Sequence, residues 1–446
     1  MRCFVGIDLG STTSKAVVLD DDGAVLGRGI TNSRSNYEMA SAVARTEAYV
    51  TARFTLFERG LAARLEERPA RDRDRLASAL KRSFRLQQYL TQLDSLERAA
   101  EDELDARRYA DRRARVRPRL REVFVRLRDG APALFGEDAK RKSDFFRDIA
   151  GAEYQVAAEE AAHPQDAPFG LLVALYDKAI LRVENEQLEL GFEANVEPAL
   201  ERVVARADAH VREAARAAAQ DAADAELTEV RAVGTGYGRA RLPFPRDQIR
   251  SEILCHGLGA HAMFPRTRTV LDIGGQDTKA IQVDDAGIVT SFQMNDRCAA
   301  GCGRYLGYIA DEMNLGLHEL GPLAQTAQRT VRISSTCTVF AGAELRERLA
   351  LGEKREDILS GLHRAIVLRA MSLLARSGGV EEQFTFTGGV ANNAAAVAAL
   401  RDLVAENYGE RTLNISPDSI YTGALGAALF ALRDVQRTHT TAEVAA

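Results

Sequence analysis

Two stretches of the sequence decide the fold: "VGIDLGSTTSKAVVLDDDG" at residues 5–23 and "VLDIGGQDTKAIQVDDAG" at residues 270–287. Each consists of an apolar strand that ends in Asp, a tight Gly turn, a second strand and an acidic turn. Glycine at a hairpin tip lets backbone N–H groups approach phosphate oxygens closely. The two stretches therefore predict a pair of phosphate-binding hairpins, and the chain lacks the GxxxxGK[ST] pattern of P-loop proteins.

The residue types in the two hairpins suit a nucleoside triphosphate with Mg²⁺. Asp8 and Asp272 stand at strand ends, where a carboxylate can hold Mg²⁺ directly or through its waters and orient an attacking water, so we expect these two to be catalytic. We expect the phosphates to be bound by residues of both turns, namely Gly10, Ser11, Thr12, Thr13, Lys15, Gly274, Gly275, Gln276 and Asp277. Lys15 and Lys279, which follow the two turns, either neutralise phosphate charge or point into solvent.

A third motif lies near the C-terminus, where "FTGGVANN" (residues 386–393) is expected to run from a strand through a Gly pair into a helix. Such a pair lets a purine and ribose slide over the backbone, so we expect Gly388, Gly389 and Asn392 to bind the nucleoside. Each motif alone could be a simple tight turn. Both hairpins and the late "TGG", in this order, favour ATP as the ligand.

The order of these motifs resembles the superfamily of actin, sugar kinases and heat-shock chaperones. The resemblance covers residues 1–33 and 226–446. It implies an α/β fold in which two ribonuclease-H-like lobes clasp ATP, close on it and reopen on hydrolysis.

The segment between the hairpins has a different texture. It is rich in Arg, Leu, Ala and Glu, its apolar residues recur at three- and four-residue spacing, and it has no Gly between Leu61 and Asp129. We predict a mainly α-helical insertion at residues 34–225 within a first lobe made of residues 1–33 and 226–267. Residues 268–446 are then the second lobe, which carries the cysteines discussed below.

Composition bounds the class of protein. The chain has 446 residues, 46% hydrophobic residues, a net charge of −5, no run of eighteen apolar residues and no signal peptide pattern. We expect a cytoplasmic globular protein with no membrane partner, and the charge gives no reason to expect nucleic acid. Five cysteines at irregular spacing favour reduced thiols over a disulfide framework.

Two of the cysteine segments call for an explanation: "NDRCAAGCGRYL" at residues 295–306 and "ISSTCTVFAGAEL" at residues 333–345. A zinc finger would need CxxC-type pairs, which are absent. Buried structural thiols are one interpretation. The other is a [4Fe–4S] cluster, which needs four thiolates and could be shared across a dimer with two cysteines from each subunit. A metal pair of Cys255 and His256 with His261 is less favoured than packing of these residues beneath the nucleotide site.

A closer resemblance rests on "GIDLGSTTSK", "DIGGQDTK", "FQMNDRCAAG", "SSTCTVFA", "TGGVANN" and "GALGAALFA", in this order. These motifs resemble the ATPase activators of 2-hydroxyacyl-CoA dehydratases and the ATPase subunits of ATP-dependent benzoyl-CoA reductase. The resemblance implies a dimer with one interfacial [4Fe–4S] cluster, whose ligands fall on Cys298 and Cys337. Cys302 stands where Thr is usual, so we interpret it as a spare or supporting thiol.

The helical insertion resembles that of the longer, A- or alpha-type ATPase subunit of benzoyl-CoA reductase. It therefore predicts a subunit that couples ATP hydrolysis to low-potential electron transfer from reduced ferredoxin. The implied partners are a smaller ATPase subunit, with which it shares the cluster, and the subunits that reduce the aromatic ring. The alternative is a dehydratase activator. A sugar or acetate-type kinase and a chaperone-like ATPase are less favoured, because neither uses paired cysteines.

Overall fold

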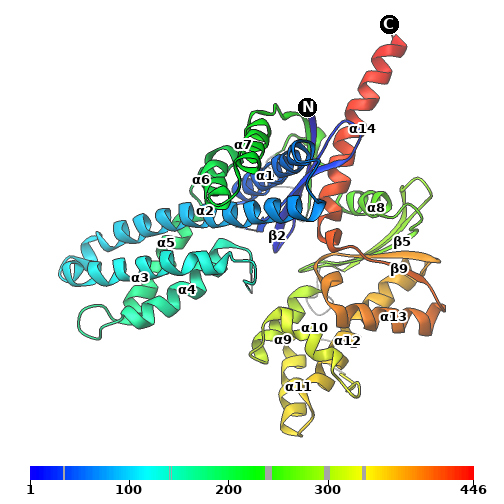
Figure 1. Cartoon of the computed structure of the whole chain (residues 1–446). Helices are drawn as coiled ribbons and strands as arrows, with labels where there is room; N and C mark the ends of the chain where they lie inside the picture. Colours follow the sequence, from blue (N-terminus) through cyan, green and yellow to red (C-terminus); the bar gives the residue numbers. More distant parts are fainter. Residues whose placement is uncertain are drawn as a thin grey trace. The chain divides into compact units, whose positions relative to one another are not determined.

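The computed structural model describes residues 1–33, 36–139, 141, 143–236, 244–295, 302–333 and 338–445. The chain forms two compact units, one of Met1–Ala48 with Leu227–Ala446 and the other of Tyr49–Glu226 (Figure 1). The limits of the insertion and of the two lobes that the sequence suggests remain predictions.

The first unit contains two sheets of matching topology. The strand order is β3-β2-β1-β4 in the first sheet and β7-β6-β5-β8-β9 in the second. In each sheet a strand pairs antiparallel with the next strand of the chain and parallel with a later one, which is β4 beside β1 and β8 beside β5. The first sheet comprises β1 (Arg2–Leu9), β2 (Thr13–Leu19), β3 (Val25–Asn32) and β4 (Thr228–Gly236). The second comprises β5 (Thr269–Ile273), β6 (Thr278–Val283), β7 (Val289–Asn295), β8 (Gln383–Thr387) and β9 (Thr412–Asn414). This repetition is the two-lobed α/β architecture that the two hairpins predict.

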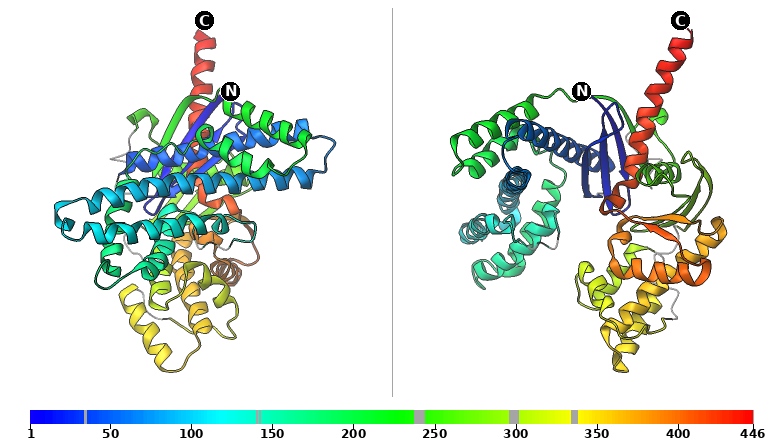
Figure 2. Two further views of the ribbon diagram at one scale, coloured as in Figure 1. Left: turned by 60° about the vertical axis from the view of Figure 1, so that its left-hand side comes forward. Right: turned by 45° about the vertical axis from the view of Figure 1, so that its right-hand side comes forward.

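Helices complete the first unit. They are α8 (Glu252–Met263), α9 (Gly303–Glu312), α10 (Leu317–Gln325), α11 (Thr338–Ala350), α12 (Arg355–Ser377), α13 (Ala394–Tyr408) and α14 (Thr422–Ala445). Short 3-10 helices are η3 (Arg246–Gln248), η5 (Gly389–Asn392) and η6 (Pro417–Tyr421). In Figure 2, α14 lies along the first sheet. Gly6 of β1 makes this close approach possible, because a Cβ there would lie 2.0 Å from the Ala424 carbonyl oxygen.

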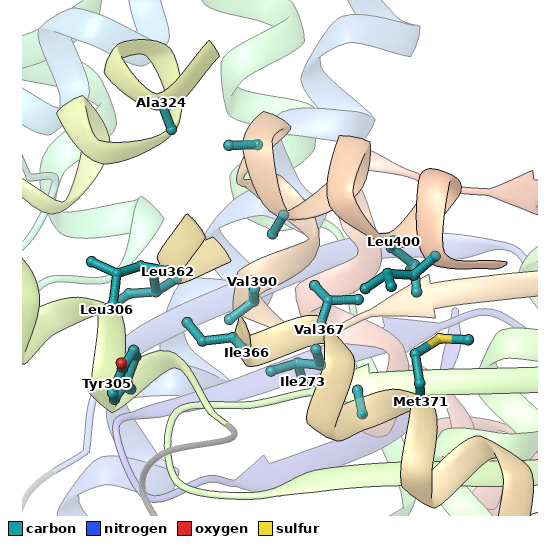
Figure 3. Packing of buried hydrophobic residues seen from close by; sticks show 14 of the residues in the cluster. Ile273, Tyr305, Leu306, Ala324, Leu362, Ile366, Val367, Met371, Val390 and Leu400 are labelled. Carbon is teal, nitrogen blue, oxygen red and sulfur yellow. The ribbon is translucent and has the colours of Figure 1, made fainter. Parts of the chain in front are cut away.

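The core of the second sheet is formed with α9 to α13. Figure 3 shows part of this cluster, with Ile273 of β5 among side chains such as Ile366 and Val367 of α12. Among the described helices, α12 is long and apolar enough to cross a membrane by length and composition, but 61% of its most apolar window is buried. It is therefore accounted for as a core helix of this unit.

The second unit is helical. It contains most of α1 (Tyr37–Arg64), and α2 (Ala70–Leu104), η1 (Arg107–Tyr109), α3 (Arg113–Leu134), α4 (Phe146–Ala161), α5 (Phe169–Val183), α6 (Phe192–Val204) and α7 (Ala209–Asp224). Figure 1 shows α2 and α3 side by side. One guanidinium joins the two ends of this unit: Arg53 Nη1 of α1 donates to the carbonyl oxygens of Ala222, Ala223 and Ala225, at 2.5, 2.9 and 3.2 Å.

Candidate nucleotide and metal site

The two hairpins place their ionisable residues in the same register. Asp8 lies opposite Lys15 on β1 and β2, and Asp272 lies opposite Lys279 on β5 and β6. All four side chains are buried, so they face the protein interior and not solvent. The like register confirms that the two sequence stretches form two versions of one structure.

The first hairpin turn is tightly held. The hydroxyl of Ser33 donates to the carbonyl oxygen of Gly10 at 2.5 Å, and the backbone N–H of Ser33 donates to the carbonyl oxygen of Thr12 at 2.8 Å. A Cβ on Gly10 would lie 2.7 Å from the Thr13 carbonyl oxygen, so the turn has no room for a side chain. The side chain of Thr12 is exposed, and Ser11 and Thr13 are half-buried. Fixed backbone with accessible hydroxyls is what a phosphate site requires.

The second hairpin turn is joined to helix α9. Gly274, Gly275 and Gln276 are half-buried, while Asp277 is buried. The backbone N–H groups of Gly303 and Arg304, in the first turn of α9, donate to the carbonyl oxygens of Gly274 and Gly275, both at 2.8 Å. Any displacement of this turn is therefore transmitted directly to the start of α9.

Lys279 does not point into solvent, which was one of the two roles that its place in the sequence allowed. It is 1% exposed, and its Nζ lies 2.9 to 3.1 Å from carboxylate oxygens of Asp277, Glu252 and Asp272. Burial opposes the charged form, but the three carboxylates, Asp272 foremost, raise the pKa of Lys279 well above its usual value. The ammonium is thus a fixed internal cation and does not point into solvent.

Asp272 has both oxygens occupied by protein groups. Its Oδ2 lies 3.1 Å from Lys279 Nζ, and its Oδ1 accepts a hydrogen bond from Thr387 Oγ1 at 2.8 Å and lies 3.3 Å from His256 Nδ1. Burial alone would raise the pKa of Asp272, but His256 and Lys279 hold it well below its usual value. Asp272 is therefore a carboxylate fixed in its charged form.

Asp8 differs from Asp272 in having an open oxygen. Its Oδ2 lies 3.6 Å from Lys15 Nζ. Its Oδ1 is buried without a hydrogen-bond partner in the part of the chain that the structure describes. A buried, unpaired carboxylate oxygen is costly unless a cation or its water occupies the space beside it. Asp8 Oδ1 therefore fits a Mg²⁺ ion or one of its water ligands better than either oxygen of Asp272.

Helix α8 adds Glu252 and His256, which belong to none of the phosphate-binding motifs. Ligand atoms of Glu252, His256 and Asp8, all buried, lie within 4.8 Å of one another, so the three could hold a metal ion. Burial raises the pKa of Glu252. Burial lowers the pKa of His256, but Asp272 more than offsets this effect, and the pKa is raised overall. The one local signal in the sequence is the four-residue spacing of Glu252 and His256 in a helix otherwise made of small and apolar residues.

The two other residues of the less favoured metal site, Cys255 and His261, lie elsewhere. Cys255 is fully buried in the cluster between α14 and the first sheet, and His261 Nε2 lies 3.1 Å from the carbonyl oxygen of Asp285. The packing interpretation of Cys255 is therefore the one that the structure favours.

The C-terminal glycine pair closes over the second hairpin. Gly388 has φ +85°, and a Cβ there would lie 2.3 Å from the Ile273 carbonyl oxygen and 3.1 Å from Asp272 Oδ1. Glycine alone suits both the left-handed backbone and this close approach. Gly389 and Asn392 are exposed on η5, directly after the Asp272 partner Thr387 and Gly388. The predicted nucleoside residues thus adjoin the predicted catalytic carboxylate.

The two predicted cluster ligands, Cys298 and Cys337, lie outside the described residues. The helices that follow them pack together: Tyr305 and Leu306 of α9 share a core cluster with Ala341 and Leu345 of α11. Cys302 caps α9 and is 1% exposed. The described helices that follow the two cysteine segments therefore lie in one region.

The fold and this site define a two-lobed ATPase of the actin, sugar-kinase and heat-shock chaperone kind. The chain belongs to the BadF/BadG/BcrA/BcrD ATPase family, whose model matches residues 5–431. It is 43% identical over 205 residues to the activator of lactoyl-CoA dehydratase from Anaerotignum propionicum, an alignment that covers 46% of this chain and 76% of that protein. It is 32% identical over 196 residues to one of the subunits of benzoyl-CoA reductase from Thauera aromatica, with 44% of this chain and 69% of that protein covered.

A solved structure supports the fold. The chain resembles the crystal structure of component A of (R)-2-hydroxyglutaryl-CoA dehydratase from Acidaminococcus fermentans, with a TM-score of 0.54 and 23% identity. The match covers 97% of this chain and 99% of that one.

Proposed function

We propose that this chain is an ATP-hydrolysing electron activator that drives a low-potential electron into a partner enzyme acting on a 2-hydroxyacyl-CoA. The observation that carries the proposal is the backbone connection between the second phosphate hairpin and α9. It ties the predicted nucleotide site to the first turn of α9, which begins directly after Cys302, so a change at the nucleotide can move this helix.

The chemistry at the nucleotide follows from the chain's own residues. Backbone N–H groups and hydroxyls of the turns at Gly10–Thr13 and Gly274–Asp277 bind the phosphates of ATP. Asp8 Oδ1 holds Mg²⁺ or its water, which neutralises phosphate charge when bound, and Asp272 stays charged and orients the attacking water. Water adds to the γ-phosphorus, the bond to the β-phosphate oxygen breaks, and ADP and inorganic phosphate leave.

The nucleotide can bias the conformation only through a difference in its affinity for the two states. Both hairpins contribute phosphate ligands, so ATP favours the state in which their tips are together, and loss of the γ-phosphate weakens that preference. Cys298 and Cys337, with the same pair from a second subunit, would ligate a [4Fe–4S] cluster, which supplies a one-electron carrier when bound.

The activator and reductase hypotheses differ in the partner enzyme. The higher identity to a named dehydratase activator supports the first. The helical unit at Tyr49–Glu226 favours the second candidate, an ATPase subunit of a ferredoxin-linked benzoyl-CoA reductase that pairs with a smaller ATPase subunit. In either case the substrate is transformed on the partner and not on this chain.

The test is anaerobic purification, followed by iron and sulfide analysis and EPR of the reduced protein. We expect a cluster signal and Mg²⁺-dependent ATP hydrolysis. Cys298→Ser and Cys337→Ser should each lose the signal, whereas Cys302→Ser, the matched control in the same segment, should keep most of it. A colourless, iron-free protein, even after reconstitution with iron and sulfide and a smaller ATPase partner, would contradict the electron-transfer function.

The partner is then identified by activity. The reduced activator with ATP is added to a 2-hydroxyacyl-CoA dehydratase and, separately, to the ring-reducing subunits of a benzoyl-CoA reductase. We expect the 2-hydroxyacyl-CoA to be dehydrated and the ring of benzoyl-CoA not to be reduced. The opposite result would favour the reductase hypothesis.

A further inference from the structure

Helix α8 turns one polar face toward both catalytic carboxylates. His256 and Glu252 lie one helical turn apart on it, and the structure brings them together with Asp8 from β1 and with Asp272 from β5. His256 is 6% exposed, its Nδ1 lies 3.3 Å from Asp272 Oδ1, and Glu252 Oε1 lies 3.9 Å from the other ring nitrogen. One buried imidazole thus adjoins a carboxylate of each lobe.

The imidazole is confined on its other side by α14. A Cβ built on Gly423 would lie 2.8 Å from His256 Nε2 and 3.0 Å from Asp8 Oδ2. The backbone of α14 therefore covers this side of the ring, and glycine is required where it does so. The position of the ring is fixed by backbone and not by flexible side chains.

The arrangement does not suit His256 as a direct metal ligand. Glu252 Oε1, which belongs to the same group of possible ligands, lies 3.0 Å from the ammonium of Lys279. A divalent cation held by Glu252 and His256 would stand close to this buried positive charge, and the repulsion would be strong in so dry a site. The cation belongs on the open Oδ1 of Asp8.

We propose that His256 is a positioning residue for ATP hydrolysis, an inference that rests on the proposed function. Together with Thr387 it occupies Asp272 Oδ1, while Lys279 occupies Oδ2, so Asp272 cannot turn toward the cation. Asp8 then remains the carboxylate with an oxygen available to Mg²⁺, and Asp272, the residue expected to orient water, is kept away from the cation. His256 therefore separates the roles of two side chains of the same chemistry.

His256 Nδ1 and Asp272 are close enough for an ion pair, but they are not aligned for a hydrogen bond. His256 Nδ1 has no hydrogen-bond partner among the described residues. Active-site contacts are often long before the substrate binds and shorten in the complex. We expect the Nδ1 contact to shorten when ATP binds between the two hairpins.

The test compares replacements that keep or remove the Nδ1 donor. His256→Asn places an amide nitrogen near the position of Nδ1, whereas His256→Leu fills the space without a donor. We expect kcat for ATP hydrolysis to fall by about tenfold or more in His256→Leu, with KM for ATP changed by less than about threefold, and His256→Asn to restore most of kcat. His261→Asn, on the same helix but bonded to the Asp285 carbonyl, is the matched control and should keep wild-type kinetics.

Two further measurements separate a positioning role of His256 from a loss of folding and from metal ligation. Thermal unfolding of each variant identifies a general loss of folding, and Mn²⁺ with a non-hydrolysable ATP analogue allows pulsed EPR to detect a histidine nitrogen bound to the metal. Equal kcat in His256→Leu and the wild type would overturn the positioning role, as would a nitrogen coupling that disappears in His256→Leu. If the wild type itself hydrolyses no ATP, the proposed function fails, and not this inference alone.

Discussion

The side chain of Thr12 lies against the backbone of Gly275, so the tips of the two phosphate hairpins touch. A Cβ built on Gly275 would lie 2.5 Å from Thr12 Cγ2 and 2.6 Å from its Oγ1. Thr12 belongs to the first hairpin and Gly275 to the second, and each comes from a different sheet. The absence of a side chain at residue 275 is what allows the two turns to meet.

The first prediction follows from this contact. Gly275→Ala should push Thr12 aside and lower ATP hydrolysis by about tenfold, because misplacement of a bound phosphate by roughly 1 Å is costly to catalysis. The matched control is Gly130→Ala in α3, where a Cβ would meet nothing within 4 Å. It should keep wild-type ATPase activity and raise the free energy of unfolding by about 0.5 to 1 kcal/mol. Steady-state kinetics of ATP hydrolysis provide the measurement. Wild-type activity in Gly275→Ala would show that the contact between the hairpins is not needed for catalysis.

A second prediction concerns the pH dependence of stability. His363 is buried on α12, with Nδ1 2.7 Å from the Leu359 carbonyl oxygen and Nε2 3.0 Å from Asn393 Nδ2. Burial lowers the pKa of His363. A folded pKa below the unfolded value means that the neutral ring stabilises the fold at pH above 6.5, and that this contribution is lost as the pH falls below 6.5.

We expect His363→Gln, which keeps an acceptor for Asn393 but cannot titrate, to lose less stability than the wild type between pH 7 and pH 5. Calorimetry of both proteins at each pH provides the measurement. The quantity to compare is the difference between the two proteins in free energy of unfolding at each pH. His256, whose pKa is raised, affects the pH dependence of stability with the opposite sign, and its effect is the same in both proteins. Parallel pH profiles would show that folding does not lower the pKa of His363.

The third prediction tests the helical unit. Glu103 is 3% exposed, and its carboxylate forms ion pairs with Arg108, with Arg182 at 3.0 Å and with Lys178 at 3.4 Å. Because the three cations are about half-exposed, they can recover water when the carboxylate is removed. Glu103→Ala should therefore lower the free energy of unfolding of this unit by about 2 kcal/mol, less than for a fully buried pair.

Its control is Glu201→Ala, which removes an exposed carboxylate 2.8 Å from Arg216 and should cost about 0.5 kcal/mol or less. Urea unfolding followed by circular dichroism at 222 nm reports mainly on helix. An equal effect of the two substitutions would argue against burial of Glu103.

The fourth prediction concerns the thiols. Cys3, Cys255 and Cys302 are buried, and burial raises the pKa of Cys3 to about 11 and that of Cys255 to about 12. Because the thiolate is the reactive form, N-ethylmaleimide at neutral pH should leave these three unmodified in the native protein. Cys298 and Cys337 should become reactive when an iron chelator is added. Mass spectrometry of the labelled peptides separates the five cysteines, and rapid native labelling of Cys255 would contradict the packing of α8 against α14.

Local pattern was sufficient for the hairpins. An apolar run that ends in Asp and is followed by a Gly turn specifies strand, turn and register together, so the Asp8–Lys15 and Asp272–Lys279 pairs follow from the sequence once the strands are aligned. The strand, Gly pair and helix around Gly388 were also predictable from "FTGGVANN", while the binding role of Gly388 stays a prediction. The two-sheet α/β fold follows from the same motifs.

Tertiary contacts supplied the rest of the site. Glu252 and His256 lie more than two hundred residues from Asp8 in the sequence, and no spacing rule links a helix in one part of the chain to a strand end in another. Burial of Lys279 could not be read from the sequence, since its partner Glu252 lies on α8 and becomes a neighbour only after folding. The exclusion of solvent around the site depends on α14, whose glycines look like any other small residues in the sequence.

The hydrogen bonds from Arg53 to three carbonyl groups at the end of α7 have a consequence for the insertion or loss of the helical unit in evolution. Arg53 lies near the start of the helical unit and Ala222, Ala223 and Ala225 lie near its end, so the chain enters and leaves this unit at neighbouring points. A gene could gain or shed the whole unit in a single recombination event without rethreading any strand, because joining two adjacent chain ends requires little loop-closure entropy. The nucleotide core and the helical unit can therefore have separate ancestries and mutate at different rates.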